Sequence, residues 1–142
     1  MKIVDLNLLL YAVNRDSPSH SRAQAWLEAT LAGDESVGLP WVVILGFLRI
    51  TTHLRILERP LPPETASQIV DGWLRQPLVG IIQPGPEHWR ILRGLLAEAG
   101  TAGNLTTDAH LATLALENGA ELCSTDGDFG RYKHLNWRNP LK

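Results

Sequence analysis

Short apolar runs of β-forming residues alternate with longer segments of helical period along the whole chain. The β-type runs lie at residues 2–4, 36–39, 79–82 and 121–123, with a weaker one around 135–137. Between them stand helical patterns at residues 6–13, 19–31, 40–53, from 63 onward, 86–99 and 108–118. Such alternation is typical of a parallel sheet covered by crossover helices on both faces. The chain is therefore predicted to have an α/β fold.

Prolines and glycines mark the ends of the predicted helices. Prolines stand where a first helical turn tolerates the missing N–H, at Pro18, Pro40, Pro63 and Pro86. Gly33, Gly100 and Gly119 stand just beyond helical segments, as left-handed helix ends prefer. Segments 19–31 and 86–99 read as amphipathic, whereas 40–53 and 108–118 are apolar nearly all round, which indicates burial or contact with a partner.

The size and composition of the chain fit a single domain over residues 1–142. The lone cysteine, Cys123, excludes an internal disulfide framework and is expected to be buried in a strand. We find no secretory signal, and the apolar stretch 39–48 is far shorter than the roughly 20 residues of a membrane span. A cytoplasmic protein is expected, and its net charge of −2 favours no particular partner.

Four aspartates, Asp5, Asp108, Asp126 and Asp128, each follow a predicted strand or open a predicted helix. Because the carboxyl ends of parallel strands share one edge of a sheet, Asp5 and Asp126 are expected to meet. Clustered carboxylates repel one another, so a cluster that stays ionised needs a cation. Oxygen ligands favour Mg²⁺ or Mn²⁺, and such a site suits phosphodiester cleavage by an activated water.

Each acid also has an ordinary structural interpretation. Asp5 is a good helix N-cap, Asp108 is favoured in a first helical turn, and Asp126 and Asp128 flank a glycine as in a common turn. Only their combination points to a site. Sequence signatures of serine or cysteine nucleophiles and of phosphate-binding glycine loops are missing, which disfavours those reaction classes.

Three motifs in this order resemble the PIN-domain ribonucleases, specifically the VapC-type toxins of toxin–antitoxin pairs. They are a strand followed by Asp5-Leu6-Asn7, the segment Thr107-Asp108-Ala109-His110-Leu111-Ala112, and the segment Ser124-Thr125-Asp126-Gly127-Asp128-Phe129. The resemblance spans the whole chain. It implies a three-layer α/β/α sandwich around a mostly parallel sheet of four to five strands.

The resemblance further implies a Mg²⁺-dependent endoribonuclease that cuts structured RNA such as tRNA or rRNA. A VapB-type antitoxin would neutralise it, and a homodimer or a toxin–antitoxin hetero-oligomer is expected. Asp5, Asp108 and Asp126 match the family's metal ligands, and Asp128 a more variable catalytic companion. The family's polar positions that orient these carboxylates correspond to Asn7 and Thr125.

One position departs from the family pattern. The helix over 40–53 usually carries a glutamate a few residues before an arginine, and here Gly46 precedes Arg49. Two hypotheses follow: an active metal-dependent ribonuclease, or a catalytically weakened module that binds RNA or antitoxin. Arg49 is expected either to hold a phosphate or to pair with an aspartate. A dehalogenase-type phosphatase is disfavoured because Asn7 stands where it needs an acid.

The remaining expectations concern histidine, aromatic and basic residues. His110 is predicted to be a packing or supporting residue rather than a ligand, because its side chain diverges from that of Asp108 on a helix. Trp26 and Trp89 are expected in the core, and Trp41 at a dimer or antitoxin interface. Candidate RNA contacts in loops are Arg15, Arg55, Arg59, Arg131 and Lys133.

Overall fold

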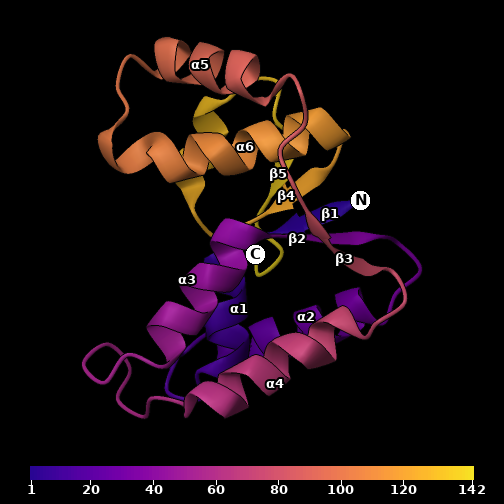
Figure 1. Cartoon of the computed structure of the whole chain (residues 1–142), viewed down its shortest axis with the longest axis vertical. Coiled ribbons are helices and arrows are strands. Elements are labelled where there is room, and N and C mark those ends of the chain that lie inside the picture. Colours follow the sequence, from indigo (N-terminus) through magenta and orange to yellow (C-terminus); the bar gives the residue numbers. More distant parts are fainter.

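A five-stranded, fully parallel sheet forms the centre of the computed structural model, which describes residues 1–142 (Figure 1). The strands lie in the order β3-β2-β1-β4-β5. Their bounds are β1 (Lys2–Val4), β2 (Val37–Pro40), β3 (Val79–Ile82), β4 (Glu121–Cys123) and β5 (Trp137–Arg138). The predicted parallel sheet is confirmed. The weak run near the end of the chain forms a strand two residues later than predicted.

Six α-helices cover the two faces of this sheet. They are α1 (Leu6–Val13), α2 (His20–Leu31), α3 (Trp41–Thr51), α4 (Pro63–Leu74), α5 (His88–Ala99) and α6 (Thr106–Asn118). Helices α1 to α4 lie on one side of the sheet, and α5 and α6 lie on the other (Figure 1). The three-layer arrangement is therefore as expected. None of these helices is both long and apolar enough to cross a membrane.

Most helix ends follow the predicted signals, but α2 and α5 begin two residues after Pro18 and Pro86, and Gly33 after α2 is not left-handed. Helix α4 begins at Pro63, and Gly100 and Gly119 cap the C-terminal ends of α5 and α6 with left-handed φ angles of 73° and 57°. Helix α6 begins at Thr106, two residues before the predicted start, because one 3₁₀ turn (η1, Gly103–Leu105) leads directly into it. Asp108 consequently lies inside the first turn of α6 rather than at its start.

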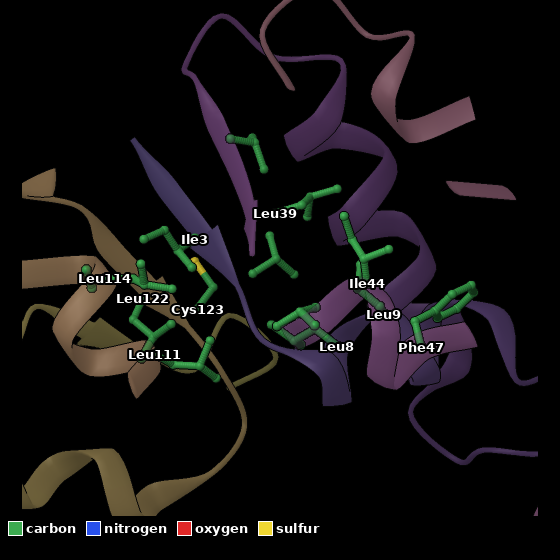
Figure 2. Packing of buried hydrophobic residues seen from close by; sticks show 14 of the residues in the cluster. Ile3, Leu8, Leu9, Leu39, Ile44, Phe47, Leu111, Leu114, Leu122 and Cys123 are labelled. Atoms are coloured by element: carbon green, nitrogen blue, oxygen red, sulfur yellow. The ribbon is translucent and has the colours of Figure 1, made fainter. Parts of the chain in front are cut away.

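Apolar side chains fill both spaces between sheet and helices. Leu111 and Leu114 of α6 pack beside Ile3 and Leu122, while Leu8, Leu9, Leu39, Ile44 and Phe47 gather on the side of α1 and α3 (Figure 2). Cys123 is buried among them, as predicted, and burial raises the pKa of its thiol to about 12. It is therefore a packing residue and not a nucleophile.

The expectation for Trp89 is wrong, since its side chain is 67% exposed. Helix α5 is an outer helix that packs chiefly on α6, and Leu95 is its one buried residue. In the first turn of α5, His88 contacts α6 while the neighbouring Trp89 faces away from it. Trp26 does pack against the core, whereas Trp41 and Leu45 of α3 expose 47% and 59% of their surfaces.

Candidate active site

The site begins where β1 and β4 end side by side. These strands pair in parallel with Val4 opposite Cys123, so the residues that follow, Asp5 and Ser124, face each other. The backbone N–H of Asp5 donates to the Cys123 carbonyl at 2.9 Å. Strand order reverses here, because β2 and β3 lie beyond β1 while β5 lies beyond β4. Ligand sites in parallel sheets typically form at such a point.

Ser124 is the centre of the hydrogen bonding at this edge. Its hydroxyl donates to Asp5 Oδ2 at 2.7 Å and accepts from the Asp126 backbone N–H at 3.0 Å. The Asn7 side-chain amide also donates to it, at 3.3 Å. Asp5 Oδ1 accepts from the Leu6 N–H at 2.7 Å, so both oxygens of this buried carboxylate have a donor.

Three further carboxylates converge beside this serine. Asp108, Asp126 and Asp128 each offer an oxygen, and these atoms lie within 4.8 Å of one another. Asp126 caps the short 3₁₀ helix η2 (Gly127–Arg131) by accepting from the Asp128 N–H at 2.9 Å. Asp108 comes from the first turn of α6. The loop after β4 and the start of α6 thus build one acidic cluster.

The charges in this cluster act on one another. Burial, followed by the charges of Asp126, Asp5 and Asp128, raises the pKa of Asp108 to about 6, against a smaller opposing effect of Arg131. Burial also raises the pKa of Asp5, which the Ser124 and Leu6 hydrogen bonds lower in part and Asp126 raises. Ionising all four acids therefore costs free energy that a bound cation would offset.

The geometry separates the predicted ligands into two kinds. Asp108 and Asp126 lie in the cluster with Asp128, which was expected to be only a companion. Asp5 is outside that group of three, with its oxygens engaged by Ser124 and Leu6. It acts on the cluster through its charge, and its role as a direct ligand remains a prediction.

Of the predicted supporting residues, only Asn7 belongs to the hydrogen-bond network of the acids. Asn7 lies at the site through its bond to Ser124, and its Oδ1 is buried without a partner in the chain. Thr125 is half-buried, and hydrogen bonds to the acids come from its neighbour Ser124 instead. Arg49 is exposed in the last turn of α3, and the arginine that acts on the acids is Arg131.

Sequence reasoning missed Ser124 and gave Arg131 only a general role. The signal for Ser124 was its place directly after a β-type run, opposite Asp5 in a parallel pairing. Arg131 follows Asp128 by three residues, and its Nε–H donates to the Asp128 carbonyl at 3.1 Å while Nη2 lies 3.7 Å from Oδ1. That spacing predicts an i,i+3 contact only if the segment is helical.

A second polar cluster lies between α5 and α6, outside the acid site. His88 Nδ1 contacts the Glu117 carboxylate, and His88 Nε2 lies 2.8 Å from His110 Nδ1. Glu117 also accepts from the Gly85 N–H at 2.8 Å. His110 thus turns toward α5 rather than toward the aspartates, as its spacing from Asp108 predicted.

Known proteins similar to this chain agree with this architecture. A family model described as PIN domain matches residues 2–135. Ribonuclease VapC33 of Mycobacterium tuberculosis is 46% identical over 142 residues, which cover 100% of this chain and 99% of that protein. Ribonuclease VapC37 of the same species is 44% identical, with coverage of 99% and 97%. The structure of VapBC-1 from nontypeable Haemophilus influenzae is similar with a TM-score of 0.72 at 14% identity, covering 99% and 98%.

Proposed function

The chain belongs to the PIN-domain family as a VapC-type ribonuclease, and on that premise we propose that its acidic cluster is the active site of a divalent-cation-dependent endoribonuclease. The observation that carries the proposal is the convergence of Asp108, Asp126 and Asp128 within 4.8 Å at the carboxyl edge of the sheet. Residues far apart in sequence build this cluster, and burial and mutual repulsion hold the pKa of Asp108 at about 6. A bound cation would offset this repulsion.

The chemistry of the residues fits Mg²⁺, with Mn²⁺ as an alternative. All donors are hard oxygens, and Mg²⁺ typically takes one or two carboxylates while keeping several waters. Asn7 Oδ1 supports this fit, because it is a buried acceptor beside the cluster without a donor in the chain. Water bound to a cation would supply that donor. We propose Asp108, Asp126 and Asp128 as the residues that hold the ion.

The remaining residues prepare this site for a polyanionic substrate. When bound, the cation supplies an activated water and neutralises charge on the phosphate. Ser124 fixes the Asp5 carboxylate and the Asp126 backbone in place, and the charge of Asp5 adds to that of the cluster. Arg131, exposed beside Asp128, offers a guanidinium to a phosphate at the rim of the site.

The natural substrate is proposed to be a structured RNA, a tRNA or an rRNA, and the partner a VapB-type antitoxin. The family relationship supports both, and the similar solved structure from Haemophilus influenzae is described as VapBC-1. We further propose that residues 1–142 act as one domain, because one sheet and one buried apolar cluster run through the chain. The family relationship supports a place in the cytoplasm. The exposed face of α3 is proposed to mediate a homodimer.

Cleavage of purified cellular RNA tests the proposal. The wild-type chain should cut RNA with Mg²⁺ and stop when a chelator is added. Asp108→Asn should lose at least about 100-fold in rate, since it removes a ligand. Asp71→Asn is a matched control, because Asp71 is an exposed acid of α4. Equal rates for wild type and Asp108→Asn would refute the proposed active site.

A catalytically weakened module that binds RNA or antitoxin is the second candidate, and Gly46 is the observation that favours it. A Cβ at Gly46 would lie 2.6 Å from Leu6 Cδ2, so Leu6 occupies the space that a glutamate side chain would need. This candidate predicts RNA binding without metal-dependent turnover. The double variant Leu6→Ala with Gly46→Glu should then gain activity, whereas unchanged activity in this variant would favour the first candidate.

A further inference from the structure

The Tyr132 hydroxyl is a buried polar group that the proposed function leaves unexplained. It and Asn7 Oδ1 are the two buried side-chain polar atoms that find no hydrogen-bond partner in the chain. A buried group left unpaired costs about 1–3 kcal/mol, so each one calls for a reason. Asn7 is accounted for by the proposed cation and its waters. Tyr132 requires a separate explanation.

Tyr132 ends η2, the short helix that begins after Asp126 and carries Asp128. Its N–H donates to the Phe129 carbonyl at 3.2 Å, and its side chain is 4% exposed. Burial raises the pKa of Tyr132; the neighbouring Arg131 lowers it, and Asp108 is the carboxylate that raises it most. The hydroxyl therefore stays protonated at neutral pH, and the charge of Asp108 acts on it.

Among the buried and half-buried carboxylates of the site, Asp108 alone lacks a hydrogen-bond donor. Asp5 accepts from Ser124 and Leu6, Asp126 accepts from the Asp128 N–H, and Asp128 contacts Arg131. The influences on the Asp108 carboxylate are burial and charges, without any hydrogen bond. A carboxylate that holds a metal is usually fixed by a hydrogen bond from behind. The helix η2 thus ends on a buried donor without an acceptor, and the cluster that Asp128 of η2 shares with Asp108 holds an acceptor without a donor.

We propose that Tyr132 is a positioning residue: its hydroxyl donates a hydrogen bond to the Asp108 carboxylate when that carboxylate turns to hold the cation. This inference rests on the proposed function. The burial of Tyr132 excludes direct contact with an RNA phosphate, so its effect passes through Asp108. Asp126 needs no such help, because the Asp128 N–H already holds its carboxylate, and the exposed Asp128 carboxylate lies 3.7 Å from the Arg131 guanidinium.

Calorimetric titration with Mg²⁺ alone tests the proposal. Tyr132→Phe removes one oxygen and should weaken Mg²⁺ binding by about tenfold, the lower end of the usual effect of losing an outer partner. The same variant should leave the unfolding temperature of the metal-free protein unchanged or raised, because the hydroxyl has no partner there to lose. Tyr11→Phe, on α1, is the matched control and should bind Mg²⁺ as the wild type does.

A spectroscopic measurement separates this role from general packing. The chain has two tyrosines, so labelling with 3-fluorotyrosine gives one ¹⁹F resonance each for Tyr11 and Tyr132. Addition of Mg²⁺ should shift the Tyr132 resonance and leave that of Tyr11 in place. Asp108→Asn should abolish the shift.

The outcomes distinguish this inference from the proposed function. Mg²⁺ binding that depends on Asp108 but is equal in wild type and Tyr132→Phe would overturn the role of Tyr132 alone. An unmoved Tyr132 resonance at saturating Mg²⁺ would do the same. Absence of any Asp108-dependent Mg²⁺ binding in the wild type would refute the proposed active site itself, and the inference with it.

Discussion

At the scale of single residues, a serine organises the site while the aspartates supply its charge. Ser124 makes three side-chain hydrogen bonds, to Asp5, Asn7 and the backbone of Asp126. It is fully buried, so none of these groups has water as an easy substitute. The adjacent Thr125, which the family resemblance pointed to, lies one residue too far along the chain to face Asp5.

Ser124→Ala is expected to destabilise the protein by about 2–3 kcal/mol, because a buried carboxylate loses a hydrogen bond and Asn7 loses its acceptor. RNA cleavage should fall with it, since Asp126 loses a support. Urea unfolding and cleavage rates measure the two effects. Thr125→Ala is the matched control and should stay within about 0.5 kcal/mol of the wild type. Equal losses in both variants would contradict the role of Ser124.

The pKa of Asp108 makes the stability of the metal-free protein depend on pH. Its folded pKa of about 6 exceeds the usual 3.8, so the folded state binds the proton more tightly than the unfolded state does. The stability that Asp108 contributes is therefore greatest at low pH and falls as pH rises from about 4 to about 6. Partial exposure of the carboxyl reduces the effect to roughly 1–2 kcal/mol.

Asp108→Asn should consequently stabilise the metal-free protein at pH 7 relative to the wild type, and this advantage should shrink toward pH 4.5. Urea unfolding in the presence of a chelator at both pH values measures the difference. With Mg²⁺ at pH 7 the order should reverse, because the wild type alone gains from binding. A difference that is the same at both pH values would show that Asp108 titrates normally.

At the scale of elements, the close approach of α3 to α1 affects the position of Asp5, which directly precedes α1. Gly46 brings α3 against the first turn of α1, where Leu6 follows Asp5 directly. A larger residue at this position would push on the segment that carries Asp5. The glycine is therefore a packing requirement of this chain as well as a departure from the family pattern.

Gly46→Ala is expected to destabilise the protein by about 1 kcal/mol, because overpacking against Leu6 outweighs the better helix propensity of alanine. Gly94→Ala on α5 is the matched control, since nothing lies within 4 Å of its added Cβ. That variant should stabilise by about 0.5–1 kcal/mol. Thermal unfolding measures the stability of both variants. A gain in stability for Gly46→Ala would contradict the close packing. Leu6→Ala should relieve the cost.

At the scale of the whole molecule, the two helical layers differ in the apolar side chains that they expose to solvent. The α5–α6 layer exposes Trp89 on an outer helix, and the opposite layer exposes Trp41 and Leu45 one turn apart on α3. Neighbouring apolar side chains on a helix are a better interface than a single exposed ring. The proposed homodimer would use this α3 face.

Trp41→Asp is expected to weaken self-association by at least about 30-fold, the effect of losing a buried aromatic anchor. Light scattering over a dilution series would then give the mass of a single chain where the wild type gives that of two. Trp89→Asp is the matched control, because it removes an equally large exposed ring from the other layer. Identical masses for the wild type and both variants would argue against the α3 interface.

The sequence by itself determined the element types, the parallel sheet and the identity of the acids. These follow from local causes: alternating apolar periods, prolines at helix starts, and glycines whose left-handed φ ends α5 and α6. The prediction for Trp89 is wrong because an apolar stripe on a helix does not show how much of that stripe a neighbouring helix covers.

Tertiary structure alone decided which groups meet. The contact between Ser124 and Asp5 joins residues 119 positions apart, and it exists because β1 and β4 are neighbours in a fixed register. The position of η2 relative to the start of α6 likewise brings Asp128 into the cluster. The contact of Arg131 with Asp128 and the unpaired hydroxyl of Tyr132 also depend on the folded shape of η2 and its surroundings. Hydrogen bonds and charge repulsion act over a few ångströms, and such distances are set by packing rather than by spacing along the chain.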